Sequence, residues 1–317
     1  MPLTLNSNAA ASTASMHLSR NSEALRNSLT RLSSGSRIVR PSDDAGGLAV
    51  AMKLESSITR LAGAQTNTQN AISFLEVQDG VLESAGKIVN RMIELKGLHQ
   101  DVMKNASDKA NYNREFRDLQ VQLHDMTAVK FNGVSMFAQF SSEAGGAEGV
   151  FNDFALDNTV SVYVSAEGST GPKVSIGKAM LLSALTLDTG TLAAGAFSTA
   201  GTGNVKSFAT ANVATAIDLD DVSVGVFTQA LQNVATLRAD NGASMSRLNF
   251  ASDNIAVTKT NMEAAKGRIV DVDIAAESTR MAKYNVLVQA SASMLAQANS
   301  TTDVALMLIR QTTKSQL

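Results

Sequence analysis

The stretch that decides the fold is residues 43–100, DDAGGLAVAMKLESSITRLAGAQTNTQNAISFLEVQDGVLESAGKIVNRMIELKGLHQ. It contains no proline, and residues suited to a helix–helix seam recur in it at alternating steps of four and three. This spacing predicts one long helix of roughly 85 Å, since an α-helix rises about 1.5 Å per residue. The seam positions are Leu54, Ile58, Leu61, Gln65, Thr68, Ile72, Leu75, Asp79, Leu82, Gly86, Val89, Ile93 and Lys96.

Polar residues interrupt this seam and also precede it. Gln65, Thr68 and Asp79 weaken an apolar seam, and we take them to fix its register. Ahead of the helix, Ser42 or Asp43 is expected to cap it, because a side-chain oxygen there can accept a hydrogen bond from a free backbone N–H. The carboxylates also face the positive end of the helix dipole. The predicted helix therefore begins near residue 43 and ends near residue 100.

Weaker helical patterns lie at both ends of the chain, the first ending at Gly35 and the last beginning after Asp271 and Asp273. Each carries one narrow apolar stripe among small and polar residues, so neither buries enough surface to fold stably alone. We therefore expect the two ends to pair and to pack against other copies of the chain. The stripe that we assign to polymerisation is Leu18, Leu25, Leu29, Leu32, Val288, Leu295 and Ile309. On the last helix the same face also carries Met281, Tyr284, Ser291, Ala298 and Ala305.

The composition changes in the middle of the chain. Ten of the 21 glycines lie within 138–224, and apolar and polar residues alternate along Val160–Val164, so short hairpins and loops are expected there. A short helical pattern at Phe116–Met126 is followed by the turn signal Phe131–Gly133. A second long pattern runs from Leu231 to Ile269 with steps of three and four.

These patterns predict a mainly α fold with a small β-rich insert. The helices are expected to form an elongated antiparallel coiled coil or bundle, with the N- and C-terminal segments paired and β-hairpins and loops in the middle. Residues 1–41 and 280–317 would form a terminal-helix polymerisation domain. Residues 42–140 and 225–279 would form a long-helix bundle, and 141–224 an outer insert rich in β structure and loops.

The composition excludes several classes of protein. Among 317 residues, 27 are basic and 29 acidic, so the whole chain shows no nucleic-acid footprint. Cysteine is absent, which excludes disulfides and thiolate metal sites. The chain has no apolar run of about 18 residues, so no membrane span is predicted. Met1–Arg20 lacks the basic cluster and apolar core of a Sec-type signal, so we expect any export to use another route.

Several motifs, in the right order, resemble the bacterial flagellin family. They are LSSGSRI at 32–38, DDAGGLA at 43–49, Phe131-Asn132-Gly133, NMEAAKGRI at 261–269, Asp271-Val272-Asp273, Gln289-Ala290 and MLAQAN at 294–299. The matches cover about residues 1–137 and 226–310 and leave the middle uncovered. The chain departs from the family at 300–303, STTD, where many flagellins have a proline, and at 311–317, which extend past the usual end.

The resemblance implies a structural subunit, not an enzyme, that assembles with copies of itself into the extracellular flagellar filament used for swimming. It implies export in an unfolded state through the flagellar type III apparatus, with an export chaperone, hook-associated proteins and a cap protein as further partners. In the family the paired terminal helices line the filament core, the longer helices form the next shell, and the β-rich middle faces outward. A hook–filament junction protein remains an alternative. So does a soluble coiled-coil adaptor, although uncovered apolar stripes at both ends argue against it.

The resemblance also implies a surface for a host Toll-like receptor. The family's receptor motif has Arg and Leu on the long helix and Glu on the next helix. Arg91 and Leu95 match the first two beside Glu94, and Glu115 matches the third if one residue is deleted before Phe131. These three matching residues are the candidate receptor contact.

No set of residues predicts catalytic, cofactor or metal chemistry. His17, His99 and His124 lie far apart in different predicted helices, so we interpret them as surface or seam residues, and no HExxH motif appears. The acids of Asp271–Glu277 are explained more simply by a helix N-cap with first-turn acids than by a cation site. Those of Asp218–Asp221 predict a solvated turn or a helix start.

Overall fold

The computed structural model describes residues 8–138, 158–188 and 205–314, and most of them are helical. The helices are α1 (Ala9–Ser34), α2 (Ala45–His99), α3 (Ala106–Thr127), α4 (Leu181–Ala184), α5 (Val224–Val270) and α6 (Ile274–Lys314). The strands form antiparallel pairs, β1 (Lys130–Phe131) with β2 (Val134–Ser135), β3 (Thr159–Tyr163) with β4 (Lys173–Gly177), and β5 (Thr186–Asp188) with β6 (Val205–Ser207). The predicted mainly α fold with a small β-rich insert is confirmed. Much of the predicted insert, 139–157 and 189–204, lies outside the described residues.

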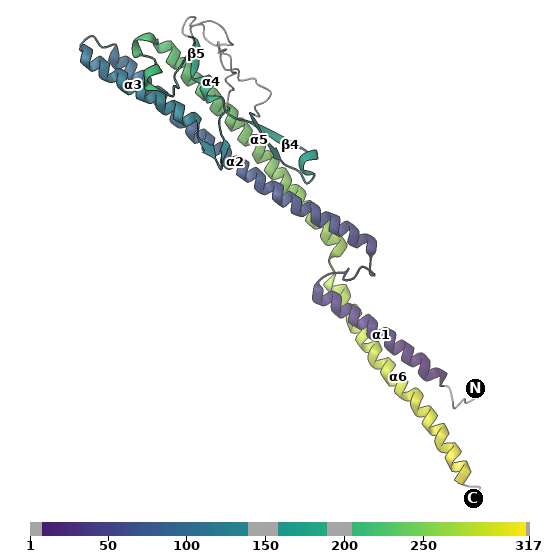
Figure 1. Cartoon of the computed structure of the whole chain (residues 1–317). Coiled ribbons are helices and arrows are strands. Elements are labelled where there is room, and N and C mark those ends of the chain that lie inside the picture. The colour runs from purple at the N-terminus through teal and green to yellow at the C-terminus, as the bar shows by residue number, and fades with distance from the viewer. Residues whose placement is uncertain (1–7, 139–157, 189–204, 315–317) are drawn as a thin grey trace. The chain divides into compact units, whose positions relative to one another are not determined.

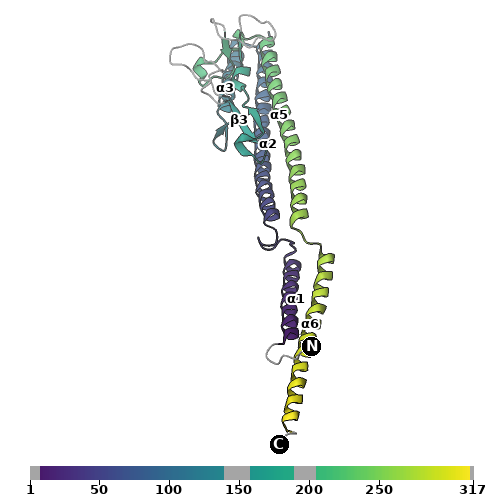
Figure 2. The same ribbon diagram turned by 90° about the vertical axis from the view of Figure 1, so that its right-hand side faces the viewer.

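The chain divides into two compact units, Met1–Ile58 with Thr260–Leu317, and Thr59–Lys259. Both α2 and α5 contribute residues to each unit. The first unit holds α1 and α6, which run side by side as an antiparallel pair (Figures 1 and 2). Asn8 caps the start of α1 and also donates from Nδ2 to the Ala298 carbonyl at 2.9 Å. The predicted pairing of the chain ends is thus confirmed.

A short joint in the first unit ties the end of α1 to the turn between α5 and α6. Gly35 ends α1 with φ of 69°, a left-handed conformation that glycine adopts without steric cost. Its carbonyl accepts a hydrogen bond from Val272 N at 3.0 Å. The Arg37 guanidinium donates to the Ile269 carbonyl at 2.7 Å. Two sequence motifs that lie more than two hundred residues apart therefore meet at this joint.

The start of α2 differs from the prediction by one residue. Asp44 caps the helix, because its Oδ1 accepts a hydrogen bond from Gly47 N at 2.8 Å. Asp43 instead accepts from Val39 N and Arg40 N at 3.1 Å, and these two hydrogen bonds lower the pKa of its carboxyl. The expectation of a cap at Ser42 or Asp43 was wrong, because Asp43 closes the preceding bend.

In the second unit, α2 and α5 run antiparallel beside each other (Figure 2). Arg238 makes two hydrogen bonds to Asp79, each of 2.9 Å, and Asn241 Nδ2 donates to the Leu75 carbonyl at 2.9 Å. Asp79 thus links the two helices as its place in the seam suggested. Thr68 does not, because its hydroxyl bonds to Ala64 O within α2.

The buried face of α2 is wider than the predicted seam. Residues 65, 72, 79, 86 and 93 are only half-buried, and Gly86 lies near Leu231 and Val234 of α5. Positions one residue earlier, 64, 71, 78, 85 and 92, are fully buried. Their side faces the β1–β2 hairpin, where the Phe74 and Phe131 rings lie 5.9 Å apart. The sequence pattern missed this second side because three of those five positions are alanine.

Candidate assembly surfaces

The predicted polymerisation stripe mostly faces inward in the terminal helix pair. Leu18, Leu25 and Leu32 of α1 are half-buried, and so are Val288 and Leu295 of α6. Polar contacts also join these faces, since Asn21 Nδ2 donates to Ser291 Oγ at 2.9 Å. The side chain of Ile309 lies outside the described residues. These five apolar residues therefore hold α1 to α6 within one chain.

Other apolar side chains of the same two helices remain uncovered within the chain. Leu29 is the predicted stripe residue that lies off the inner face, and 48% of it is exposed. On α6, Val286 and Met294 are each 65% exposed. At 100° per residue, Val286 lies about 160–180° around α6 from Val288 and Leu295, and Met294 lies about 100–120° from them, so both point away from the inner face. This outer face is available to other molecules.

The two terminal helices also differ in extent. The N-cap residue of α1, Asn8, lies beside Ala298, whereas α6 continues to Lys314. Val304 and Met307 lie in this extension, and both are exposed. The last part of α6 thus extends past the described part of α1.

The start of α6 combines a cap with a buried carboxylate. Asp273 Oδ1 accepts hydrogen bonds from Ala275 N and Ala276 N at 3.0 and 3.1 Å, which confirms the predicted N-cap. Glu277 lies in the first turn of α6, as predicted. It is buried, and its Oε2 pairs with Arg280 at 3.0 Å. Its Oε1 accepts no hydrogen bond in the described structure.

The candidate receptor residues are only partly brought together at the surface. Arg91 of α2 pairs with Glu115 of α3 and with Glu94, at 2.8 and 2.7 Å. Both carboxylates raise the pKa of Arg91. Leu95, by contrast, is completely buried in the core. It therefore offers no surface to a partner in this conformation, because its side chain fills the space between α2 and its neighbours.

Polar residues of α2 and α3 hold the segment before α5, which the sequence did not predict. Gln120 is buried and brackets Ile217, accepting from its N at 3.0 Å and donating to its O at 2.8 Å. Arg117 pairs with Asp218, and Lys96 Nζ donates to the Leu219 carbonyl. Of the two predicted alternatives for 218–221, a solvated turn or a helix start, the structure shows the helix start, since Asp218 precedes the short 3-10 helix Leu219–Asp221. Asp220 and Asp221 are exposed, whereas Asp218 is tied to Arg117. The sequence gives little sign of these contacts, because the residues that make them lie about a hundred positions apart in the chain.

An aromatic cluster anchors the same region. Phe208 follows β6 and stacks on Phe227 of α5, with ring centroids 4.9 Å apart. Phe116 of α3 meets Phe227 and Phe208 edge to face, at 5.8 and 6.5 Å. All three rings are buried. They join α3, the end of the insert and the start of α5 into one core.

The described ranges hold neither a metal-binding cluster nor a membrane-spanning helix. No group of three metal-binding side chains comes together in the described parts of the chain. His99 is buried beside Asp220, with Nδ1 and Oδ1 3.6 Å apart, and lies on a different helix from His17 and His124. Among the described helices, none has the length and apolar character needed to cross a membrane.

Known proteins share this arrangement of helices at the two chain ends. Residues 5–142 match the family model for the bacterial flagellin N-terminal helical region, and residues 224–309 match that for the C-terminal helical region. The chain is 31% identical to flagellin FlaB2 of Treponema pallidum over 292 residues, covering 90% of this chain and 93% of that protein. This chain belongs to the bacterial flagellin family.

Other flagellins match over nearly the whole length. Identity to the flagellin of Bacillus subtilis is 30% over 314 residues, which cover 96% of this chain and 99% of that protein. A flagellar filament 33 kDa core protein of Treponema phagedenis is 29% identical over 317 residues, with 96% and 99% covered. A crystal structure of Bacillus cereus flagellin is also similar, at 22% identity and a TM-score of 0.41, and covers 63% of this chain and 94% of that one.

Membership of this family gives the protein its role. Flagellins are structural proteins that polymerise into the extracellular flagellar filament, and this flagellin is a structural subunit of such a filament. The joint around Gly35 and Val272 lies within the two matched regions, 5–142 and 224–309. The long helices and their paired ends are therefore the features through which its filament role must be explained.

Proposed function

We propose that the terminal helices α1 and α6 form the filament core by using two different faces. The inner face, with Leu18, Leu25 and Val288, holds the pair together. The outer face, with Val286 and Met294, packs against other copies of the chain. The observation that carries this proposal is the 65% exposure of both outer residues on a helix that already packs against α1 through another face.

The extension of α6 past Ala298 supports the same division of roles. Val304 and Met307 are 59% and 69% exposed there. Burying an apolar side chain stabilises an assembly by roughly 25 cal/mol per Å². Neighbouring copies supply that burial in a filament. Burial by neighbouring copies explains why the single chain leaves these apolar side chains of α6 exposed.

The predicted layers follow from this assignment. Residues 1–41 and 280–317 would line the core, and 42–140 with 225–279 would form the surrounding shell. Residues 141–224 would face outward. The chain would act purely as a structural subunit, because the polar clusters of the described residues serve caps, ion pairs and segment anchoring.

Truncation tests the proposal directly. Chains lacking residues 1–32 or 285–317 should remain soluble and partly helical but form no filaments under conditions in which the full chain does. Electron microscopy and sedimentation measure filaments, and circular dichroism measures helix content. A chain shortened only by residues 315–317 is the matched control and should still polymerise. Filaments from either long truncation would contradict a core built from α1 and α6.

The flagellar export apparatus, an export chaperone, hook-associated proteins and the cap protein are the further partners that we propose. A chaperone would act by covering the outer face of α6 before export, since that face is apolar and uncovered in the single chain. Binding of an export chaperone should therefore weaken when Val286 and Met294 become serine. Unchanged affinity would place the chaperone elsewhere.

We also propose that any recognition by a host Toll-like receptor uses Arg91 and Glu115 without Leu95. The ion pair of 2.8 Å fixes both side chains at the surface, whereas Leu95 is buried. A receptor reporter-cell assay should show a reduced response to Arg91→Ala and Glu115→Ala. Absence of any response to the parent protein would end this proposal.

A further inference from the structure

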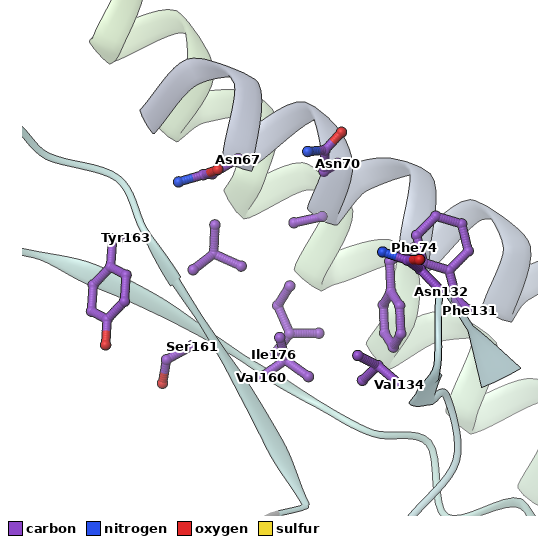
Figure 3. A pocket seen from close by; sticks show the side chains of 12 residues that line it. Asn67, Asn70, Phe74, Phe131, Asn132, Val134, Val160, Ser161, Tyr163 and Ile176 are labelled. Atoms are coloured by element: carbon purple, nitrogen blue, oxygen red, sulfur yellow. The ribbon is translucent and has the colours of Figure 1, made fainter. Parts of the chain in front are cut away.

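An apolar groove lies in the second unit, between α2 and the two hairpins β1–β2 and β3–β4 (Figure 3). Its volume is about 280 Å³. Phe74 of α2, Val134 of β2 and Val160 of β3 form its apolar walls, and Asn67 and Asn70 lie along its rim. A groove of this size accommodates one or two aliphatic side chains.

The β1–β2 hairpin forms one wall of this groove. Asn132 and Gly133 have φ of 47° and 81°, and two positive values at the centre of a two-residue turn match the right-handed twist of a tight hairpin. The turn sets Phe131 against Phe74, with ring centroids 5.9 Å apart in an edge-to-face contact. The wall is therefore built by specific packing.

The same unit carries an uncovered apolar tip. Val102 and Met103 lie in the turn between α2 and α3, where they are 93% and 89% exposed. Asp101 Oδ1 accepts a hydrogen bond from Met103 N at 2.9 Å, which holds the turn in shape. Two adjacent large apolar side chains at such exposure have no role within the described chain.

We infer that the Val102–Met103 tip of one flagellin chain docks into the groove between α2 and the two hairpins of a second copy. The two features cannot meet within one chain. The stretch of α2 from Ala71 to His99 separates them by about 40 Å, at about 1.5 Å per residue, and both belong to one compact unit. A tip that enters the groove then comes from another molecule, and copies of this chain are the molecules that the filament places beside it.

A tip and a groove on different parts of one chain make a head-to-tail contact. Such a contact does not close on itself, because each copy presents a free tip and a free groove after docking. Repetition generates an open filament, which is the assembly that flagellins form. Copies joined in this way are displaced by about 40 Å or slightly more along α2. The inference rests on the proposed polymerisation and adds a contact outside the terminal helices.

Cysteine cross-linking tests the contact. The chain has no cysteine of its own, so only the introduced thiols can form disulfides. The double variant Met103→Cys/Asn70→Cys is polymerised and treated with diamide, a thiol oxidant. A disulfide needs Cα atoms about 4.4–6.8 Å apart, so the two positions cannot be joined within one chain. A ladder of covalent oligomers on a denaturing gel is the expected result. Met103→Cys/Val257→Cys, with the second thiol on exposed α5, is the matched control and should give no ladder.

The outcomes separate this contact from polymerisation itself. Filaments without a ladder would overturn the inference and leave the terminal-helix proposal intact. Cross-linking that stops at dimers would overturn the head-to-tail arrangement. Failure of the unmodified chain to polymerise would instead overturn the proposed function.

A second measurement holds even where the cysteine variant fails to polymerise. Val102→Ser/Met103→Ser should raise the critical concentration for filament formation by about tenfold or more, because a buried apolar contact is lost. Thermal unfolding of the monomer should not change, since both side chains are almost fully exposed in it. An unchanged critical concentration would overturn the inference.

Discussion

The outer face of α6 gives the most direct test of how this flagellin assembles. We predict that Val286→Ala/Met294→Ala weakens polymerisation while leaving the monomer intact. Both residues are 65% exposed in the single chain, so the filament can still bury most of each side chain. Full burial of such a side chain contributes about 1.5–3 kcal/mol. Alanine retains part of it, which leaves a loss of about 2–3 kcal/mol per subunit for the pair.

This loss translates into a measurable concentration. Each 1.4 kcal/mol changes an association constant about tenfold, so the critical concentration should rise by about 30- to 150-fold. Sedimentation of filaments at graded protein concentrations measures it. Alanine has the highest helix propensity, so the substitutions themselves do not weaken α6. A rise of less than about threefold would refute the assignment of this face to subunit contacts.

A matched substitution separates this effect from a general loss of surface hydrophobicity. Val257 lies on the long helix α5 and is 61% exposed. Val257→Ala should leave the critical concentration close to that of the parent chain. Inner-face Val288→Ala should instead lower the helix content of the monomer, because Val288 is half-buried in the pair of terminal helices.

Further predictions concern the stability of the two units. Phe208→Ala should destabilise the Thr59–Lys259 unit by about 3–5 kcal/mol in urea unfolding, because a buried ring stacked at 4.9 Å is removed. The hydrogen bonds from Arg238 lower the pKa of the Asp79 carboxyl in the folded protein. The stabilisation that they give is therefore fully present above the unfolded pKa of about 3.9, and it is lost as the pH falls through the lower pKa of the folded state. Asp79→Asn should therefore cost about 1 kcal/mol or less at pH 7 and nothing at strongly acid pH, as urea unfolding at both values would show. Gly35→Ala should speed hydrogen exchange in the last turn of α1, because alanine at φ of 69° is strained by about 1–2 kcal/mol.

The division between inner and outer faces changes the meaning of the terminal stripes. Leu18 and Leu295 were expected to polymerise, and they also turn out to be half-buried in the contact between α1 and α6. Apolar periodicity in a sequence identifies the most regularly spaced apolar face of a helix. In this chain that face serves the intrachain pair, so residues with less regular spacing, such as Met294, remain for assembly.

A flagellin with a tip-and-groove contact would have two classes of subunit contact. One uses α6 and is broad and apolar along a helix. The other uses Val102 and Met103, which are confined to one turn. The proposed cross-linking and alanine experiments distinguish the two, because each leaves the residues of the other unchanged.

The amino-acid sequence by itself determined the helices, their approximate ends and the pairing of the chain termini. Periodicity sufficed for α2 and α5, and Gly35 marked the end of α1 correctly. These features depend on neighbours within a few turns of helix, and such local preferences are visible in sequence.

Only the tertiary structure decided how much of each helix is covered beyond its regular apolar face. The second buried side of α2 was not visible because Ala64, Ala71 and Ala85 look unremarkable as apolar anchors, yet all three are buried. Gln120 is hydrogen-bonded to Ile217, and the Gly35 carbonyl to Val272 N, and each pair is separated by more than ninety residues of chain. Burial depends on which distant segments return to a helix face, and a periodic pattern carries no information about that return.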